Sequence, residues 1–336
     1  IVLKMKNEIN LQEKIFIAGS NGMVGSAIFR KLKEKGYGNE NLGGKILTPP
    51  RNVLDLLNLS ELKDWFALNK PTVVILAAAK VGGIVANASY PFDFIYENIK
   101  IQTNVIETSW LNGVKRFVFL GSSCIYPKYA TQPIKEEELL NGYLEKTNES
   151  YAIAKITGIK LCEALRKQYN FDAISLMPTN LYGPNDNYHP LNSHVVPSLI
   201  RKFSIAKRDN LSSVTCWGSG LVCRELMHVD DLAEAVIFCL ENWFPSEINA
   251  PKDNYGNPLN YLNVGTGKDI SVKELAKKIA DIVKFDGEIF WDKNMPDGTP
   301  RKVLDISRLK KLGWESKIDL TSGLENTINA LDINNF

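Results

Sequence analysis

The sequence predicts an α/β protein with a Rossmann-type doubly wound parallel sheet and a smaller C-terminal substrate-binding lobe. Short apolar runs alternate with helical patterns through the first half of the 336 residues, as in sheets built from right-handed crossovers. The run at residues 72–77 is continuously apolar, which is typical of a strand covered on both faces. The first run ends at a glycine-rich turn, and a helical pattern follows it. Ligands of such sheets bind beyond the carboxyl ends of the strands.

Each element of the sheet follows from its local pattern. Strands are expected where the apolar runs fall, at residues 15–18, 45–47, 72–77, 117–120 and 173–176. Helices are expected where apolar residues recur with helical spacing, at residues 23–35, 95–111 and 151–169. The polar sequences Gly121-Ser-Ser-Cys124 and Met177-Pro-Thr-Asn-Leu181 then come to lie at one edge of the sheet.

The pattern becomes irregular after Asn180, so a second domain is expected over residues 178–226 and 266–331. The first domain then covers residues 1–177, with residues 227–243 and about 261–265 returning to it. The sequence His228-Val-Asp-Asp231 is expected to cap a returning helix at residues 232–240, and residues 242–260 to form a loop. Ser271, with Glu274 at the capping-box spacing, predicts a helix at residues 271–283.

Composition and charge indicate a globular protein of ordinary type. Apolar residues make up 44% and charged residues 23%, and 40 Lys and Arg against 38 Asp and Glu give a net charge of +2. This balance favours neither nucleic acid nor a membrane surface as a partner. No apolar run approaches the roughly 20 residues that span a bilayer, and the start resembles no signal peptide. Since Ile1 is not a start residue, Met5 is a candidate initiator.

The cysteines indicate a reducing compartment. They are odd in number, scattered and without C-x-x-C spacing, so we expect reduced thiols, no disulfide and no metal site in a cytoplasmic protein. The five positions are Cys124, Cys162, Cys216, Cys223 and Cys239.

The glycine-rich turn predicts a dinucleotide site. Gly19, Gly22 and Gly25 stand between a strand and a helix, where backbone amides and the helix N-terminus can meet a pyrophosphate. The second strand ends without the acidic residue that usually binds the ribose of NAD, and Arg51 is the nearest charge. We therefore expect NADP, with a surface arginine as the alternative interpretation. Asp55 follows, and either reaches the adenine or caps a turn.

Tyr151 and Lys155 are candidates for proton transfer. Four residues apart on a helix, they share one face, and a cation beside a phenol is expected to lower its pKa from about 10. The phenol could then supply the proton of a carbonyl reduction, whose hydride comes from a nicotinamide. Taken alone, a Tyr-x-x-x-Lys spacing arises more often by chance or for packing than for catalysis. It gains weight from the dinucleotide turn and from Ser122, which can donate to a carbonyl oxygen, while Ser123 is expected to shape the turn.

Cys124 and His194 are candidates for an additional acid and base. A buried cysteine is usually inert, but a thiol at this strand end can exchange protons near pH ~8.5. His194 opens an apolar helical run, where it could equally bond to the backbone. Such a pair would serve epimerisation at carbons next to a ketone. Further on, a nucleotide-linked substrate is indicated by an aromatic face and charged groups at Trp217, Lys202, Arg224 and Asp297, although each could be a surface feature.

With these motifs assembled, the chain closely resembles the GDP-L-fucose synthases, a branch of the extended short-chain dehydrogenase/reductase family, from about residue 14 to residue 331. The strings that carry the resemblance are Gly22-Met-Val-Gly-Ser-Ala-Ile28, Ala77-Ala-Ala-Lys-Val-Gly-Gly-Ile-Val-Ala-Asn87, Leu120-Gly-Ser-Ser-Cys-Ile-Tyr-Pro-Lys128, Tyr151-Ala-Ile-Ala-Lys155, Pro178-Thr-Asn-Leu-Tyr-Gly-Pro184 and Pro296-Asp-Gly-Thr-Pro-Arg-Lys302.

The resemblance implies NADPH-dependent 3,5-epimerisation and 4-reduction of GDP-4-keto-6-deoxy-D-mannose by a homodimer that pairs helices at about residues 92–111 and 151–169. It implies a reductive triad of Ser122, Tyr151 and Lys155, an epimerisation pair of Cys124 and His194, and GDP-sugar contacts at Lys202, Trp217, Arg224 and Asp297. The implied NADP(H) contacts are Gly19, Ser20, Asn21, Gly22, Met23, Val24, Gly25, Arg51, Leu120, Gly121, Ser122, Ser123, Lys155, Pro178, Thr179, Asn180, Leu181 and His194.

One departure bears on the coenzyme, because Asn21 stands where relatives carry a basic residue near the 2′-phosphate.

Three rival functions stay open. A 4,6-dehydratase would need carboxylates where Ser123 and Cys124 stand, and a 4-epimerase would retain NAD and need no Cys/His pair. A non-catalytic NADP-binding regulator would have broken triad positions, and none is broken.

Overall fold

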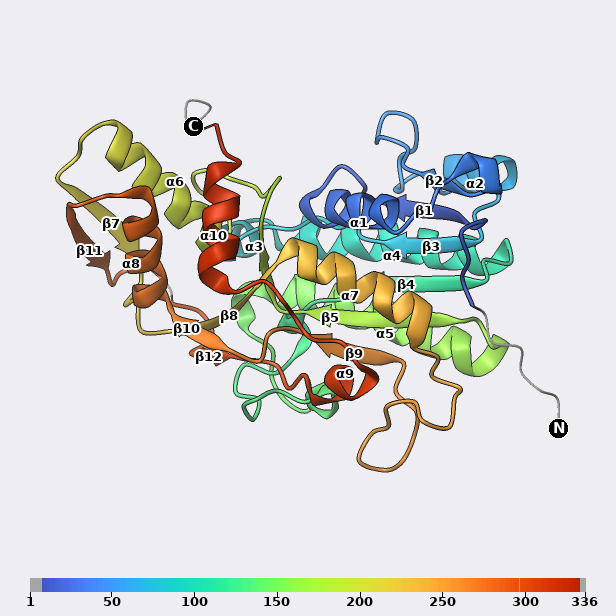
Figure 1. Cartoon of the computed structure of the whole chain (residues 1–336). Helices are drawn as coiled ribbons and strands as arrows, with labels where there is room; N and C mark the ends of the chain where they lie inside the picture. Colours follow the sequence, from blue (N-terminus) through green and yellow to red (C-terminus); the bar gives the residue numbers. More distant parts are fainter. Residues whose placement is uncertain (1–7, 296, 333–336) are drawn as a thin grey trace.

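The computed structural model describes residues 8–295 and 297–332, and its centre is a parallel sheet of six strands (Figure 1). The strand order is β2-β1-β3-β4-β5-β9, and every neighbouring pair runs parallel. This confirms the predicted fold class. The strands are β1 Lys14–Ala18, β2 Lys45–Leu47, β3 Val73–Leu76, β4 Arg116–Leu120, β5 Ala173–Pro178 and β9 Tyr261–Val264.

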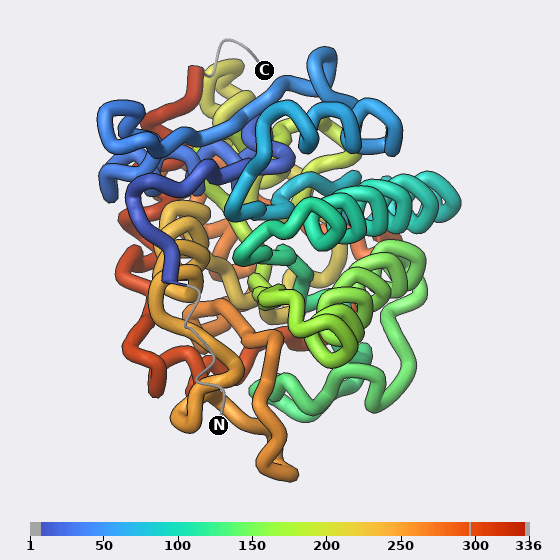
Figure 2. The backbone as a smooth tube through the Cα atoms, turned by 90° about the vertical axis from the view of Figure 1, so that its right-hand side faces the viewer, coloured from blue at the N-terminus to red at the C-terminus, as the bar shows by residue number. Residues whose placement is uncertain are grey.

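Helices cover both faces of the sheet because alternate strand residues point to opposite sides. Ile15 and Ile17 join one apolar cluster with α1 (Met23–Glu34) and α7 (Val229–Asn242). Phe16 and Ala18 join the other cluster, on the opposite face. The helices of that second face are α2 Leu59–Asn69, α4 Pro91–Leu111 and α5 Glu149–Tyr169. Figure 2 shows α4 and α5 side by side at the edge of the molecule.

A smaller group of elements stands beyond the carboxyl ends of the strands. Strand β8 (Cys223–His228) pairs with β10 (Asp269–Ser271), β12 (Arg301–Lys302) and β6 (Asn180–Tyr182). Strands β7 and β11 form a separate parallel pair. A third apolar cluster lies beneath the helices of this part. The remaining bounds are β7 Ser213–Trp217, β11 Glu288–Asp292, α6 Val195–Arg208, α8 Val272–Val283 and α10 Leu320–Asn329.

Two predicted helix starts are confirmed in their capping geometry. The Ser271 side chain accepts from the backbone amide of Glu274, and the Glu274 side chain accepts in return from the backbone of Ser271. His228 caps α7, since its Nδ1 atom accepts from the backbone N–H of Asp230 at 3.2 Å. The helix α7 extends beyond the predicted residues 232–240 at both ends, and its start is earlier because His228 alone supplies the cap.

The connecting segments include short helical turns. A long irregular segment separates α7 from β9, as predicted for residues 242–260. The short elements are α3 Ile84–Ser89, α9 Ser307–Leu312 and the 3₁₀ turns Glu40–Leu42, Ser123–Ile125, Glu136–Glu138 and Lys146–Asn148. Three positions named from the sequence, Ile1, Met5 and Pro296, lie outside the described residues.

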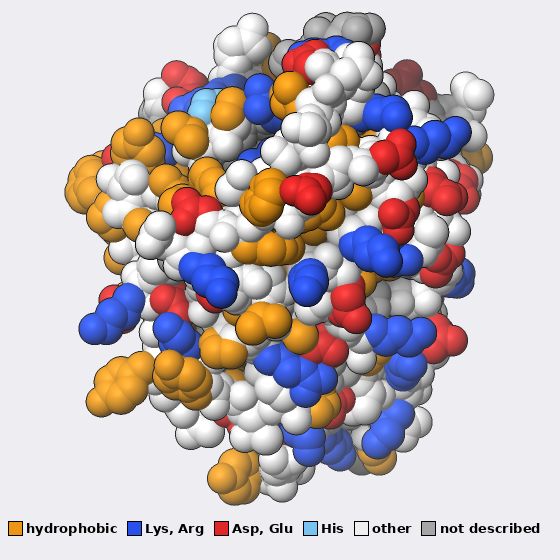
Figure 3. Space-filling view, turned by 90° about the vertical axis from the view of Figure 1, so that its left-hand side faces the viewer, with side chains coloured by type: hydrophobic (Ala, Val, Ile, Leu, Met, Phe, Trp, Pro, Cys, Tyr) orange, Lys and Arg blue, Asp and Glu red, His pale blue; other side chains and the backbone are white. Residues whose placement is uncertain are grey.

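The surface is mixed in charge. Figure 3 shows the outer face of the smaller group of elements, where cationic and anionic side chains alternate without a large field of one sign. Within the described part of the chain, no helix combines the length and apolar character needed to cross a membrane.

Candidate active site

A cavity of about 930 Å³ runs between the sheet and the smaller group of elements. At one end it is lined by the turn after β1, and at the other by Trp217 of β7. The ends of β3, β4 and β5 open into it, together with the first turn of α6. Cavities of this kind beyond the carboxyl ends of parallel strands are where such folds bind nucleotides.

The glycine turn after β1 fits a pyrophosphate. Gly19 has φ 90°, a conformation that glycine adopts at no steric cost, and a Cβ atom on Gly25 would lie 2.1 Å from the Gly19 carbonyl oxygen. A Cβ on Gly22 would meet nothing closer than 3.5 Å, so the turn is open on that side. The helix α1 starts at Met23, directly after Gly22, and its N-terminus points its free amides at the cavity.

Arg51 lines the same end of the cavity. Its side chain is 77% exposed, and its Nε atom lies 4.0 Å from Oδ1 of Asp55. Asp55 Oδ1 also accepts from the backbone N–H of Leu57 at 3.1 Å. Of the two interpretations left open for Asp55, turn capping is therefore the one that the contacts favour.

The reductive candidates meet at the end of β4. Tyr151 and Lys155 stand on the first two turns of α5 and line the cavity with Ser122. The Lys155 ammonium donates to the Leu120 carbonyl oxygen at 2.8 Å and lies 5.7 Å from the centroid of the Tyr151 ring. Ser122 Oγ accepts from the backbone N–H of Cys124 at 3.3 Å.

The pKa values of this pair differ from the sequence expectation. Burial, with a further contribution from Cys124, raises the pKa of Tyr151 well above its ordinary value, whereas Lys155 was expected to lower it. Burial also lowers the pKa of Lys155 to about 8. The expectation was wrong because loss of solvent disfavours both charged forms, and the ammonium is directed at a carbonyl oxygen.

Cys124 is held in the 3₁₀ turn that follows Ser122 and is only 8% exposed. It lines the large cavity and also an adjoining small cavity. Burial raises the pKa of its thiol, while the hydrogen bond with Ser122 and the charges of Lys302 and Lys155 act in the opposite direction. The thiol is therefore near two cations as well as near the cavity.

His194 stands across the cavity as the residue before α6. Its imidazole makes no capping hydrogen bond to the helix, so the alternative of a backbone-bonded histidine is not supported. The backbone around it is fixed by Gly83, whose N–H donates to the Asn192 carbonyl oxygen at 3.0 Å. A Cβ atom on Gly83 would lie 2.5 Å from the Ser193 carbonyl oxygen, so only glycine permits this approach. The surrounding protein, and then the charge of Lys302, lower the pKa of His194.

The four predicted substrate residues line the far end of the cavity. The Lys202 ammonium lies 5.0 Å from the centroid of the Trp217 ring and donates to the Thr215 carbonyl oxygen at 2.8 Å. The Arg224 guanidinium donates to the backbone carbonyl oxygens of Thr299 at 2.6 Å and Asp297 at 2.8 Å. The Asp297 carboxylate accepts from the Ser219 N–H at 2.8 Å. These contacts tie the loop that carries Asp297 to both β8 and the turn after β7.

The structure adds one residue that the sequence patterns did not single out. Lys302, on β12, lines both cavities and contributes to the pKa values of Cys124 and His194. In the sequence analysis, Lys302 was only the last residue of the motif at residues 296–302 and was given no role. A lysine directly before the apolar pair Val303 and Leu304 was the available signal that its side chain is surrounded by protein.

Comparison with known proteins gives consistent matches. The model of the "NAD dependent epimerase/dehydratase family" matches residues 15–250. The chain is 50% identical to "GDP-L-fucose synthase" of Escherichia coli (strain K12), covering 94% of this chain and 95% of that protein. It is also 50% identical to "GDP-L-fucose synthase 1" of Arabidopsis thaliana, covering 94% and 91%.

Among solved structures, a GDP-mannoheptose C4 reductase from Campylobacter jejuni with NADP bound superposes with a TM-score of 0.83. It is 36% identical in sequence, and the match covers 97% of this chain and 99% of that one.

Proposed function

The chain belongs to the NAD dependent epimerase/dehydratase family and to its extended short-chain dehydrogenase/reductase branch, and from this membership we propose that it converts GDP-4-keto-6-deoxy-D-mannose into GDP-L-fucose. Its general activity is that of an NADP-dependent oxidoreductase and epimerase of nucleotide sugars.

One observation carries it. A single cavity is lined by the reductive candidates Ser122, Tyr151 and Lys155, and also by a thiol and an imidazole at Cys124 and His194. Reduction alone needs only the first group. A separate acid and base beside a ketone site supports stereochemical inversion before reduction.

The coenzyme is NADP(H), and we propose that the turn at residues 19–25 and Arg51 hold its phosphates. When bound, the coenzyme supplies the hydride that reduces C4 of the sugar. Around it, the residues that line the cavity at Leu120–Ser123, Pro178–Leu181 and His194 would fix its position and exclude water.

Epimerisation is assigned to Cys124 and His194. The C4 ketone acidifies the hydrogens on C3 and C5, so a thiolate can remove a proton from one face of the ring and an acid can return one to the other face. Ser122 and Tyr151 donate to O4 and stabilise the enolate that forms between the two transfers. Burial lowers the pKa of His194, so its imidazole favours the neutral form until a proton is delivered to it during the exchange.

Reduction is assigned to Ser122, Tyr151 and Lys155. Tyr151 holds the proton that O4 receives, and its raised pKa keeps the phenol protonated until then. Lys155 supplies a positive charge beside the ring, and its hydrogen bond to Leu120 fixes α5 against the end of β4. Ser122, two residues beyond the end of β4, donates to the carbonyl oxygen and orients it.

Recognition of the GDP moiety is assigned to the far end of the cavity. Trp217, 38% exposed, offers an aromatic face to the base, and Lys202 and Arg224 offer cations to the diphosphate. Asp297 acts by holding the turn after β7. On this assignment the part of the chain around the six-stranded sheet binds the coenzyme, and the part around α6 and α8 binds the sugar nucleotide.

A plain 4-reductase is the nearest rival function, because the NADP-bound structural neighbour is a C4 reductase at 36% identity. The identity of 50% over 94% of the chain to the fucose enzymes favours the bifunctional activity. A 4,6-dehydratase or a 4-epimerase would have no use for both a thiol and an imidazole in this cavity.

We also propose that a second copy of the chain binds across α4 and α5. Five large apolar side chains on these helices are exposed, among them Phe92 (68%), Tyr96 (49%) and Ile153 (40%). The rings of Phe92 and Tyr96 stack with centroids 5.2 Å apart. Ile153→Asp should convert a dimer into a monomer in light scattering, whereas Ile248→Asp, at an 83% exposed residue of the segment before β9, should not.

The activity itself is tested by incubating the protein with NADPH and GDP-4-keto-6-deoxy-D-mannose in deuterium oxide. The expected result is loss of NADPH absorbance and a GDP-L-fucose product with deuterium at C3 and C5. GDP-mannose should leave the NADPH absorbance unchanged. Consumption of NADPH with no deuterium at either carbon would identify a plain reductase and reject the epimerase part.

A further inference from the structure

Lys302 is the unassigned cation of the site. Its half-buried side chain lines both the large cavity and the small cavity of about 20 Å³ that adjoins Cys124. Among the residues that the structure describes, its ammonium takes part in no hydrogen bond or ion pair, whereas the Lys155 ammonium is bonded to Leu120. Of the two cations that act on the thiol, Lys302 is therefore the one that is free to pair with it.

Cys124 and Lys302 line the same small cavity, which supports an electrostatic interaction between the thiol and the ammonium. Its lining is polar, since Glu145 and Asn148 join Cys124 and Lys302 around it. A volume of this size holds one water molecule when several polar partners surround it. A thiolate and an ammonium on the same small polar space stabilise each other across it, because little bulk solvent screens their charges.

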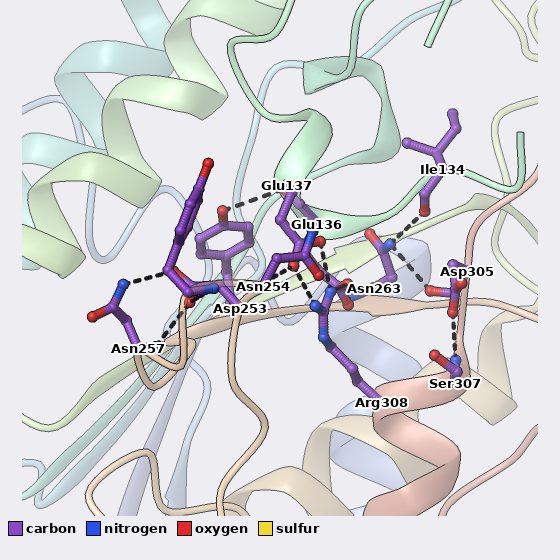
Figure 4. A network of polar contacts seen from close by, with 12 residues as sticks. Ile134, Glu136, Glu137, Asp253, Asn254, Asn257, Asn263, Asp305, Ser307 and Arg308 are labelled. Carbon is purple, nitrogen blue, oxygen red and sulfur yellow. Dashed lines mark hydrogen bonds and ion pairs between the residues drawn. The ribbon is translucent and has the colours of Figure 1, made fainter. Parts of the chain in front are cut away.

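The segments that follow the two groups are fastened to one buried side chain, that of Asn263 on β9, which Figure 4 shows between Ile134 and Asp305. Its Nδ2 donates to the carbonyl oxygens of Ile134 at 2.9 Å and Asp305 at 3.2 Å, which fixes the orientation of the amide. Its Oδ1 then accepts from the Tyr126 hydroxyl at 2.6 Å. Tyr126 is two residues after Cys124, and Asp305 is three residues after Lys302.

Further bonds make this fastening rigid. The Ile134 N–H donates to the Val303 carbonyl oxygen at 2.8 Å, and the Asp305 N–H donates to Ile134 at 2.8 Å. Glu136, 1% exposed, accepts from the Asn263 N–H at 3.0 Å and pairs with Arg308 (Figure 4). The backbone that follows Cys124 and the backbone that follows Lys302 are thus tied to the same residue of β9.

We propose that Lys302 is a positioning residue that acts through Cys124: its ammonium is the counter-cation that maintains the thiolate used in epimerisation, and Asn263 sets their separation. This inference rests on the proposed function only for the use of the thiolate. The ion pair itself requires no sugar.

The surrounding charges agree with this role. Cys124 faces Ser122, Tyr151, Lys155 and Lys302, of which the two lysines favour the thiolate. The Glu145 carboxylate lines the same small cavity and opposes the thiolate, but its charge is paired with Lys128 at 2.7 Å. Burial lowers the pKa of Lys302 to about 8, Cys124 and Glu225 act to raise it, and Arg224 acts to lower it. Lys302 is therefore still mostly charged at neutral pH. The charge of Lys302 also disfavours the protonated form of His194.

The test measures the ionisation of Cys124 directly. Iodoacetamide alkylation of its peptide is followed by mass spectrometry between pH 6 and pH 10 in the full-length protein. Lys302→Met should shift the alkylation profile of Cys124 to higher pH by about one unit or more. The reaction at pH 7 should then be roughly tenfold slower. Lys302→Arg should restore it. Tyr126→Phe, which removes only the hydroxyl bonded to Asn263, should slow the reaction about two- to threefold.

Lys202→Met is the matched control, because it removes a cation from the far end of the same cavity and should leave the profile unchanged. NADPH binding and the melting temperature report whether each variant is folded. If Lys302→Met does not fold, Lys302→Gln replaces it. The inference is overturned if the alkylation profile of Cys124 is unchanged in Lys302→Met or in its replacement Lys302→Gln. It is also overturned if Lys302→Arg slows the alkylation as much as the neutral variant does. If the parent protein does not convert the sugar and Lys302→Met still shifts the alkylation profile of Cys124, the proposed function is rejected and the ion pair is retained.

Discussion

The Nζ atom of Lys155 on α5 donates a 2.8 Å hydrogen bond to the carbonyl oxygen of Leu120, the last residue of β4. Leu120 is followed by Gly121, Ser122, Ser123 and Cys124, which line the cavity. One buried ammonium therefore lies beside Tyr151 and also fixes the start of the turn that carries the thiol.

This position predicts that Lys155→Met damages activity without damaging stability. Burial of the ammonium has a cost, as its pKa of about 8 indicates, and an apolar side chain of similar length avoids it. We expect turnover to fall by about 10²-fold or more, while the free energy of unfolding at pH 7 stays equal or rises. Urea unfolding and NADPH oxidation measure the two effects. Lys160→Met, at an exposed ion pair with Glu163 on the same helix, should change neither.

Cys124→Ser should abolish epimerisation and leave coenzyme binding intact. A hydroxyl ionises far less readily than a thiol, so proton exchange at C3 and C5 should fall to background. NADPH binding should be retained because the side chain is small and the 3₁₀ turn needs no thiol. Deuterium incorporation measured by NMR, beside NADPH titration by fluorescence, checks both. Unchanged incorporation would remove Cys124 from the epimerisation step.

Tyr151→Phe should retain exchange better than reduction. The phenyl ring preserves the edge contact with Phe94, whose centroid is 6.3 Å away, so the site keeps its shape. The proton for O4 is lost, and reduction should fall about 10²-fold or more. Single-turnover NADPH oxidation gives the rate. Near-normal turnover would exclude the phenol as the proton donor.

Arg51→Ala should reduce the preference for NADPH over NADH. The guanidinium is exposed at the cavity edge with Asp55 4.0 Å away, so it is available to a 2′-phosphate. Loss of one charge-assisted hydrogen bond should raise the KM for NADPH about tenfold and leave that for NADH unchanged. Arg30→Ala is the control, since Arg30 pairs with Asp230 outside the cavity. Equal KM changes for both coenzymes would contradict the assignment.

Asp186→Asn should stabilise the protein at high pH. Burial raises the pKa of Asp186 to about 7, above its value of about 4 in an unfolded chain. Between these values the folded state holds more protons, so the stability contributed by the neutral carboxyl is present below pH ~4 and is lost as the pH rises through about 7.

An amide carries no charge to bury, and it keeps the oxygen that accepts from the Asn187 N–H at 2.7 Å. The variant should therefore melt at least about 2 °C higher than the parent at pH 8 and within about 1 °C of it at pH 4, by calorimetry. Asp209→Asn should show no such gain, because Arg208 lowers the pKa of Asp209. A gain that is independent of pH would show that the effect comes from packing.

Much of the sheet could be predicted because its signals are local. The strands were visible as apolar runs, and Ser271 with Glu274 predicted the start of α8 from two residues. The helix α2 was not predicted, since Leu62 and Phe66 are its only fully buried positions and its pattern is weak. The pairings of β8 with β6, β10 and β12 join segments far apart in the chain, which no local pattern specifies.

At the site, the sequence predicted which residues face the cavity but not how charge is distributed among them. Tyr151 and Lys155 were correctly placed on one helix face, yet the direction of the Tyr151 pKa depended on burial that spacing does not reveal. Lys302 and Asn263 were missed for the same reason. Their roles depend on contacts with residues more than a hundred positions away, such as Cys124 and Tyr126.

The place of β9 in the sheet has a consequence for biosynthesis. Its residues, Tyr261–Val264, pair with β5, which ends more than eighty positions earlier in the chain. A nascent chain of which only the first five strands of the sheet have left the ribosome therefore has β5 as an unpaired edge strand. That edge can pair with neighbouring nascent chains. Truncated products that stop before this strand should be recovered as aggregates or bound to chaperones.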